Sequence, residues 1–318
     1  MANNASKQNT TIKGSRIFGD YLVMLIAPCV VAVWYYGTGV LSVIAVSVLT
    51  ALACDFAASA LLGKNFRLKD FSNIFIGASI ALMMPAGIPL YIPATAAAFA
   101  VVAVKIPFGG ALHAPFVPSA AGFAFVSVCF KEQIFSYTVN TSDKFLGATS
   151  LGALLAKGSS VSLEGVNAVD ILTGNVAGPM GTGCVLLMFG CCAYLFVRRR
   201  KALLATAGFV AMCALYAAVS PRINGSVFTS IVLELSAGSL LFAAVFLITD
   251  HATLPQNGVN RVIYGAVCGF FCMAMRSVGT YEETVCFAIL FANGLRPVID
   301  AAYNALPALF SKKKGGGR

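Results

Sequence analysis

The segment SDKFLGATSLGALL, residues 142–155, places a threonine hydroxyl beside two small residues in a polar part of an apolar chain. Gly147 and Ala148 leave room for a bulky group next to Thr149, whose hydroxyl can form a phosphoester. Asp143 is suited to help position the enzyme that makes such a bond. The alternative is a helix start, in which Thr149 or Ser150 caps the run LGALLAKG. Taken alone, the triplet Gly-Ala-Thr favours the cap.

Three carboxylates lie within apolar runs, in ALACDFAAS (Asp55), SIVLELSAG (Glu234) and RPVIDAAYN (Asp300). A carboxylate at membrane depth is costly and indicates an ion or proton path by default. A structural ion pair or hydrogen bond between helices is the other interpretation, and both stay open for Glu234. Asp300 is one helical turn after Arg296, a spacing that favours a local ion pair.

The ten cysteines lie within or at the edges of apolar runs, where cysteine behaves as a small hydrophobic residue. A metal or iron–sulfur site needs about four converging thiolates, and the sequence contains no Cys-x-x-Cys pair. His113 and His251 occupy unrelated contexts. We therefore predict no metal site, and buried, structural roles for the cysteines at positions 29, 54, 129, 184, 191, 192, 213, 268, 272 and 286.

The composition predicts an all-α polytopic membrane protein. Of the 318 residues, 58% are hydrophobic and 11% are charged, with a mean hydropathy of +0.84, whereas soluble domains carry about 25% charged residues. The net charge of +10 does not indicate nucleic-acid binding, because the basic residues cluster in short loops between apolar runs. The first twenty residues are polar and basic and contain no cleavable signal pattern.

About ten spans are expected, in two groups of five, because each run is long enough to cross about 30 Å of hydrocarbon or nearly so. The first half occupies residues 1–130 with spans at 20–36, 38–62, 71–88, 90–106 and 116–130. A polar segment, 131–181, follows. The second half occupies residues 182–318 with spans at 182–198, 203–220, 226–249, 259–276 and 284–309.

The positive-inside rule gives the expected orientation. With the N-terminus in the cytoplasm, sixteen Lys and Arg residues fall inside and five outside, while Arg296 lies within the last span. Both termini then face the cytoplasm and the segment 131–181 faces outward. Five spans per half imply two halves of inverted topology, with sites at the midplane between them. This architecture alone fits a stand-alone secondary transporter or channel equally well.

Three stretches in order resemble one known family along nearly the whole chain. They are FSNIFIGASIALMMPAGIPLYIPATAAAFAVVAVKIPFGG (71–110), the segment from Asp143 to Thr149, and TDHATLPQNGVNRVIYGAVCGFFCMAMR (249–276) continued by ETVCFAILFANGLRPVID (283–300). The family contains the D subunit of the Rnf electron-transport complex and the B subunit of the sodium-pumping NADH:quinone reductase.

The resemblance implies a flavin-bearing subunit of an ion-translocating ferredoxin:NAD oxidoreductase that is not active alone. FMN would be attached to Thr149 by a dedicated flavin transferase, with Asp143, Gly147 and Ala148 completing the motif, and a second, non-covalent flavin is a further expectation. Electron flow would drive Na⁺ or H⁺ across a bacterial or archaeal inner membrane, with Asp55, Glu234 and Asp300 as candidates for the ion path. The chain lacks nicotinamide and iron–sulfur motifs, so iron–sulfur, NADH-binding and second FMN-bearing subunits are the implied partners within the membrane lipid.

Two departures from the family pattern concern particular residues. Leu146 stands where the family has a small hydroxyl residue in Asp-x-x-(Ser/Thr)-Gly-Ala-Thr. His113 and Val117 replace amides of the family, so no role of those amides is carried over. A third interpretation, a structural subunit that has lost its flavin, rests on the Leu146 departure alone.

Overall fold

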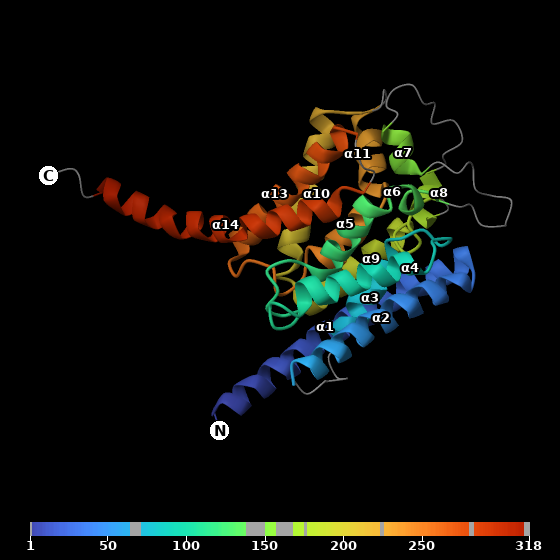
Figure 1. The fold of residues 1–318 in the computed structure, drawn as a ribbon. Helices are drawn as coiled ribbons and strands as arrows, with labels where there is room; N and C mark the ends of the chain where they lie inside the picture. Colours follow the sequence, from blue (N-terminus) through green and yellow to red (C-terminus); the bar gives the residue numbers. More distant parts are fainter. Residues whose placement is uncertain are drawn as a thin grey trace.

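A computed structural model describes residues 2–63, 71–137, 150–156, 168–174, 177–222, 226–279 and 283–314. Throughout these residues the regular structure is helical, and they contain no strand (Figure 1). The all-α class expected from composition is confirmed.

The first half begins with two long helices that run side by side (Figure 1). They are joined by a tight turn in which Gly37 has a φ of 77°. Three shorter elements follow, of which the first two pack against the second long helix and the third packs against the first two. In chain order the helices are α1 Ala2–Tyr36, α2 Gly39–Leu61, α3 Ser72–Leu82, α4 Tyr91–Phe99 continued by the π-helix η1 Ala100–Lys105, and α5 Pro118–Cys129.

Short helices separate the halves, namely α6 Lys131–Ile134, α7 Leu151–Ala156 and α8 Ala168–Thr173. The second half then contains α9 Val185–Arg199, α10 Leu203–Val219, α11 Val227–Ser236, α12 Leu240–Phe242 with the π-helix η3 Ala243–Leu247, α13 Gly258–Ser277 and α14 Val285–Lys314. The last part of α14 extends away from the rest of the molecule (Figure 1).

Four of the described helices are long and apolar enough to cross a membrane, at Arg16–Tyr36, Gly39–Leu61, Gly258–Ser277 and Val285–Tyr303. The bent pair α11 and α12–η3 can provide a fifth. Five expected spans are shorter as helices, against about 20 residues for a full crossing. They are α3 with 11 residues, α4 continued by η1 with 15, α5 with 12, α9 with 15 and α10 with 17. The span expected at 71–88 ends early because Pro85 follows Met84, and the residue before a proline avoids helical geometry.

The run expected as one continuous span at 226–249 is broken. Val227–Ser236 and Leu240–Leu247 meet at an angle of 71°. Gly238 sits in the break with a φ of 64°, a left-handed conformation that favours glycine. Hydropathy predicted the apolar run correctly, but the Ser-Ala-Gly-Ser sequence at 236–239 ends the first helix.

The two halves share one hydrophobic core. Its fully buried side chains include Tyr21 of α1, Ile76 of α3, Tyr264 of α13 and Ile289 of α14. The Tyr21 hydroxyl donates a hydrogen bond of 2.6 Å to the Thr249 carbonyl, which ties the first helix to the segment after η3. The halves are therefore packed as one body, and α5 also contacts α14.

The helices α10 and α13 form the most extensive pairing in the described structure. A Cβ on Gly265 would overlap the carbonyl oxygen of Ala205 and lie 2.9 Å from the backbone nitrogen of Phe209. Close backbone contact through small residues is the usual way membrane helices associate, since apolar surfaces alone give no preference over lipid.

Gly265→Ala should therefore lower the free energy of unfolding by at least about 1–3 kcal/mol, because the added methyl meets backbone that cannot rotate away. The measurement is the thermal unfolding midpoint of the purified protein in detergent. Gly190→Ala in α9 is the matched control, since a Cβ there meets nothing within 4 Å. Equal midpoints for the two variants would contradict the close contact.

Candidate functional site

The expected flavin attachment motif, Asp143, Gly147, Ala148 and Thr149, lies outside the described residues, and the chain is next described at Ser150. Ser150 is buried and directly precedes the first residue of α7. The position before a helix is the usual place for a capping serine. The capping role of the alternative interpretation is thus available to Ser150 and does not require Thr149.

The helix after the motif, α7, packs against other helices of the described structure. Leu151 and Leu155 of α7 are buried in a small cluster with Leu233 of α11 and Ala237, which directly follows α11. The same cluster contains Ile171 of α8 and Val185 of α9. The attachment motif therefore ends two residues before a side chain that is packed against the broken helix.

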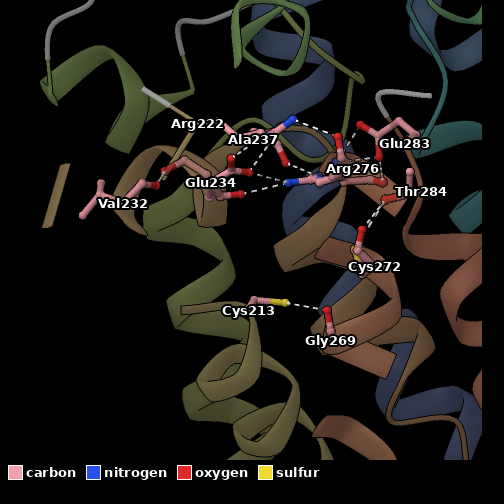
Figure 2. A network of polar contacts seen from close by, with 12 residues as sticks. Cys213, Arg222, Val232, Glu234, Ala237, Gly269, Cys272, Arg276, Glu283 and Thr284 are labelled. Atoms are coloured by element: carbon pink, nitrogen blue, oxygen red, sulfur yellow. Dashed lines mark hydrogen bonds and ion pairs between the residues drawn. The ribbon is translucent and has the colours of Figure 1, made fainter. Parts of the chain in front are cut away.

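At the break between α11 and α12, Glu234 forms an ion pair with two arginines from other parts of the chain (Figure 2). Arg222 donates two hydrogen bonds to it, from Nε to Oε1 at 2.5 Å and from Nη2 to Oε2 at 2.6 Å. The Nη1 atom of Arg276 is 3.6 Å from Oε2. Glu234 is 2% exposed, so the charge is compensated rather than solvated.

The same Arg276 caps the end of α11. It donates from Nη1 to the carbonyl of Glu234 at 3.0 Å and from Nη2 to that of Ala237 at 2.9 Å (Figure 2). Carbonyls at a helix C-terminus have no partner within the helix, so a buried helix end needs one from outside. A planar guanidinium reaches both carbonyls at once.

An acid completes the other side of the break. Glu283 accepts hydrogen bonds from the backbone nitrogen of Ser239 at 2.9 and 3.0 Å and a further one from the Ser239 hydroxyl. These groups lie at the start of α12. A Cβ on Gly238 would overlap Oε1 of Glu283, so this acid also requires glycine in the break. Arg276, a cation, thus stabilises the C-terminal end of α11, and Glu283, an anion, stabilises the N-terminal end of α12, as the helix dipole favours.

Asp55 lies in a second, separate cluster. Lys105 of η1 is 3% exposed and places Nζ 3.4 Å from Oδ2 of Asp55. Asn73 of α3 donates to the same oxygen at 2.9 Å and accepts from Nζ at 2.7 Å. The orientation argument counted Lys105, at the end of the expected span 90–106, among the sixteen cytoplasmic cations, whereas the structure buries it in this triad because Asp55 and Asn73 supply its partners.

Asp300 lies in a third cluster, and the pair expected from its spacing is present. Nε of Arg296 is 3.7 Å from Oδ2 of Asp300, and Asn260 of α13 donates to Oδ1 at 2.6 Å. The residues that contact the three carboxylates do not overlap. The structure therefore places Asp55, Glu234 and Asp300 in three separate sites, each beside a cation.

The sequence analysis did not identify Arg222, Arg276 or Glu283 as site residues, because they lie between the expected spans or at the end of one. The only local signal was Arg276 at the end of an otherwise apolar run. Among the described residues, no group of three or more His, Cys, Asp or Glu side chains could hold a metal ion. The prediction that all ten cysteines are buried is wrong for half of them. Those at 191, 213, 268, 272 and 286 are buried, those at 29, 54, 184 and 192 are partly exposed, and Cys129 is exposed.

The chain was also compared with known protein families and with individual proteins. Residues 3–306 match the model of the NQR2, RnfD, RnfE family. A relative from Salmonella paratyphi A, named as the D subunit of an ion-translocating oxidoreductase complex, is 26% identical over 95% of both chains. A protein of the same name from Halorhodospira halophila is 27% identical over 84% of both. With almost the whole chain matched by the family model, this protein belongs to the NQR2, RnfD, RnfE family.

Proposed function

We propose that this chain is the flavin-bearing membrane subunit of an ion-translocating oxidoreductase complex. Family membership and the names of the relatives support the subunit role. The chain matches these relatives over 84–95% of their own length, so the correspondence extends to whole proteins. The setting is a bacterial or archaeal cytoplasmic membrane, with both termini inside and the segment 131–181 outside.

FMN is attached through its phosphate to Thr149, and this is supported by the chemistry of the motif. A hydroxyl is the group needed for a phosphoester, and Gly147 and Ala148 on its N-terminal side carry almost no side chain. Asp143 helps the flavin transferase to recognise the segment. When bound, FMN supplies one- and two-electron redox chemistry, which the side chains of this chain do not provide.

The flanking residues support this assignment by anchoring one end of the segment. Ser150 is buried, Leu151 and Leu155 of α7 are buried in one cluster with Leu233 of α11, and Glu234 of α11 is held by Arg276 and Arg222. The cavity between α7, α8 and the break has a volume of about 20 Å³, which suffices for one water molecule.

Ion translocation is the second part of the proposal. Electrons enter from iron–sulfur and NADH-binding partner subunits, and their passage drives Na⁺ or H⁺ transfer. Asp55, Glu234 and Asp300 are the candidates for ion-path residues, since each is an acid inside an apolar helix. Of the two acids paired with buried cations, Asp55 is the more accessible, at 18% exposure against 2% for Glu234.

The observation that carries the proposal is the attachment motif at Thr149, and in-gel flavin fluorescence tests it. The protein is co-expressed with a flavin transferase, denatured in SDS and compared with Thr149→Val. Thr141→Val is the matched control, a threonine of the same polar segment outside the motif. We expect a fluorescent band in wild type and Thr141→Val and its complete loss in Thr149→Val.

The absence of a band in the wild type, with the transferase active on another substrate, would overturn the flavin assignment and favour the stand-alone transporter. Electron transfer by the assembled complex tests the remaining alternative. A subunit that has lost its flavin would support full electron transfer with Thr149→Val, whereas our proposal expects a loss.

A further inference from the structure

A basic cavity lies at one end of the helix bundle, distant in sequence from the attachment motif. It has a volume of about 680 Å³ and is lined by three separate parts of the chain. These are the start of the apolar part of α1, the connection between α9 and α10, and the region from the end of η3 to the start of α13. Its cationic lining residues are Arg16, Arg198, Arg199, Arg200, Lys201 and Arg261.

Among the described residues, these cations outnumber the acids that could neutralise them. The one acid that lines the cavity, Asp20, pairs with Arg198 at 3.0 Å. Asp250 interacts electrostatically with Arg199, and burial raises the pKa of Asp250 to about 6. Even with both acids ionised, most of the cations have no carboxylate partner within the described structure, so the cavity attracts anions.

The protein itself positions several of these cations. The guanidinium of Arg199 lies 5.1 Å from the ring centroid of Tyr21 and donates to its hydroxyl at 3.4 Å. Nε of Arg261 donates to the Pro255 carbonyl at 2.7 Å, and its remaining N–H groups have no protein partner among the described residues. Arginine presents N–H groups in a fixed fork that matches phosphate oxygens.

The position of the cavity points to a lipid rather than a soluble ligand. The apolar part of α1 begins at Arg16, α9 ends at Arg199, and α10 and α13 begin at Leu203 and Gly258. The cavity therefore lies where helices leave the hydrocarbon, at the level of lipid headgroups. Ile17 and Leu254 add an apolar wall, as a ligand with an acyl chain requires.

We propose that this cavity binds the phosphate group of an anionic membrane phospholipid. Clustered Lys and Arg at a membrane end are also used as orientation signals, but orientation requires only that the charges be on one side. In this protein, cations from three chain segments line one cavity, which orientation alone would not require. Basic pockets between helices that bind lipid headgroups have this arrangement. The proposal is independent of the flavin.

The test uses the full chain in a neutral detergent. Phosphatidylglycerol and phosphatidylcholine with the same acyl chains are titrated separately, and bound lipid is counted by native mass spectrometry alongside the thermal unfolding midpoint. We expect phosphatidylglycerol to bind and raise the midpoint and phosphatidylcholine to do neither. Equal effects of the two lipids would overturn the proposal, and this arm needs no variant.

The variant Arg200→Gln/Lys201→Gln identifies the site. Its affinity for phosphatidylglycerol should fall about thirtyfold, which corresponds to about 1 kcal/mol for each lost cation. Lys312→Gln/Lys313→Gln removes the same charge from the C-terminal segment and should leave the affinity unchanged. Equal losses of affinity in the two double variants would mean that the net charge of the protein alone attracts phosphatidylglycerol, and would overturn the assignment of the site to this cavity.

A titration with inorganic phosphate distinguishes a lipid phosphate group from a soluble phosphate ligand. At concentrations up to those used for lipid, it should neither raise the midpoint nor displace phosphatidylglycerol, because it lacks the acyl chain. Stabilisation by inorganic phosphate that is lost in Arg200→Gln/Lys201→Gln would assign the cavity to a soluble phosphate ligand and overturn the lipid assignment.

Discussion

Arg276→Met should lower the free energy of unfolding by about 3–5 kcal/mol, the range for breaking one side of a buried ion pair. The substitution takes one cation from Glu234 and leaves the carbonyls of Glu234 and Ala237 without the hydrogen bonds that Arg276 donates. Arg276 is 3% exposed, so water does not replace these contacts.

The thermal unfolding midpoint in detergent measures this effect. Arg198→Gln is the control, because that arginine also pairs with an acid but is 56% exposed, and exposed ion pairs contribute about 0–1 kcal/mol. Arg276→Lys should recover only part of the loss, since an ammonium does not present the planar fork that reaches two carbonyls. A shift no larger than that of Arg198→Gln would contradict the role of Arg276.

Lys105→Met should be the second severe substitution, with a loss of about 3 kcal/mol or more. Among the described residues it leaves Asp55 with Asn73 as its remaining side-chain partner, in a largely apolar helix. Methionine keeps the length and the apolar stem, so the loss reports the charge and its hydrogen bonds rather than a cavity.

The double variant Asp55→Asn/Lys105→Met separates stability from ion transport. Because both charges are removed, it should be more stable than Lys105→Met alone. Ion transport by the assembled complex in vesicles is then measured with the stable double variant. Loss of transport would support Asp55 as an ion-path residue, whereas full transport would leave the triad a purely structural role. A double variant as unstable as the single one would contradict the ion pair itself.

Hydropathy predicted where the chain becomes helical because burial in lipid and burial in a core both select apolar runs. It could not predict the break at Gly238, because the average over 226–249 stays apolar while the helix ends in the middle. The same limit applies to α3, where Pro85 rather than hydropathy sets the end.

Whether a polar contact could be predicted depends on how far apart its two residues lie in the sequence. The Arg296–Asp300 pair was predictable because both residues lie on one helix, four apart. Arg276 is 42 residues from Glu234, and Lys105 is 50 from Asp55, so only the tertiary structure brings them together. The positive-inside rule counted Lys105 among the cytoplasmic cations because the rule counts charges without knowing their partners. The flavin motif came from family resemblance, and the attachment to Thr149 stays a prediction.

The break between α11 and α12 also has a consequence for the membrane potential. An elementary charge that moves across the full membrane gains or loses about 2.3 kcal/mol per 100 mV, so a break that carried a net charge would be pushed by a membrane potential. Arg222 and Arg276 contribute two positive charges at this break, and Glu234 and Glu283 contribute two negative ones. With the four groups ionised, their charges sum to zero, so a membrane potential does no net work when they move together.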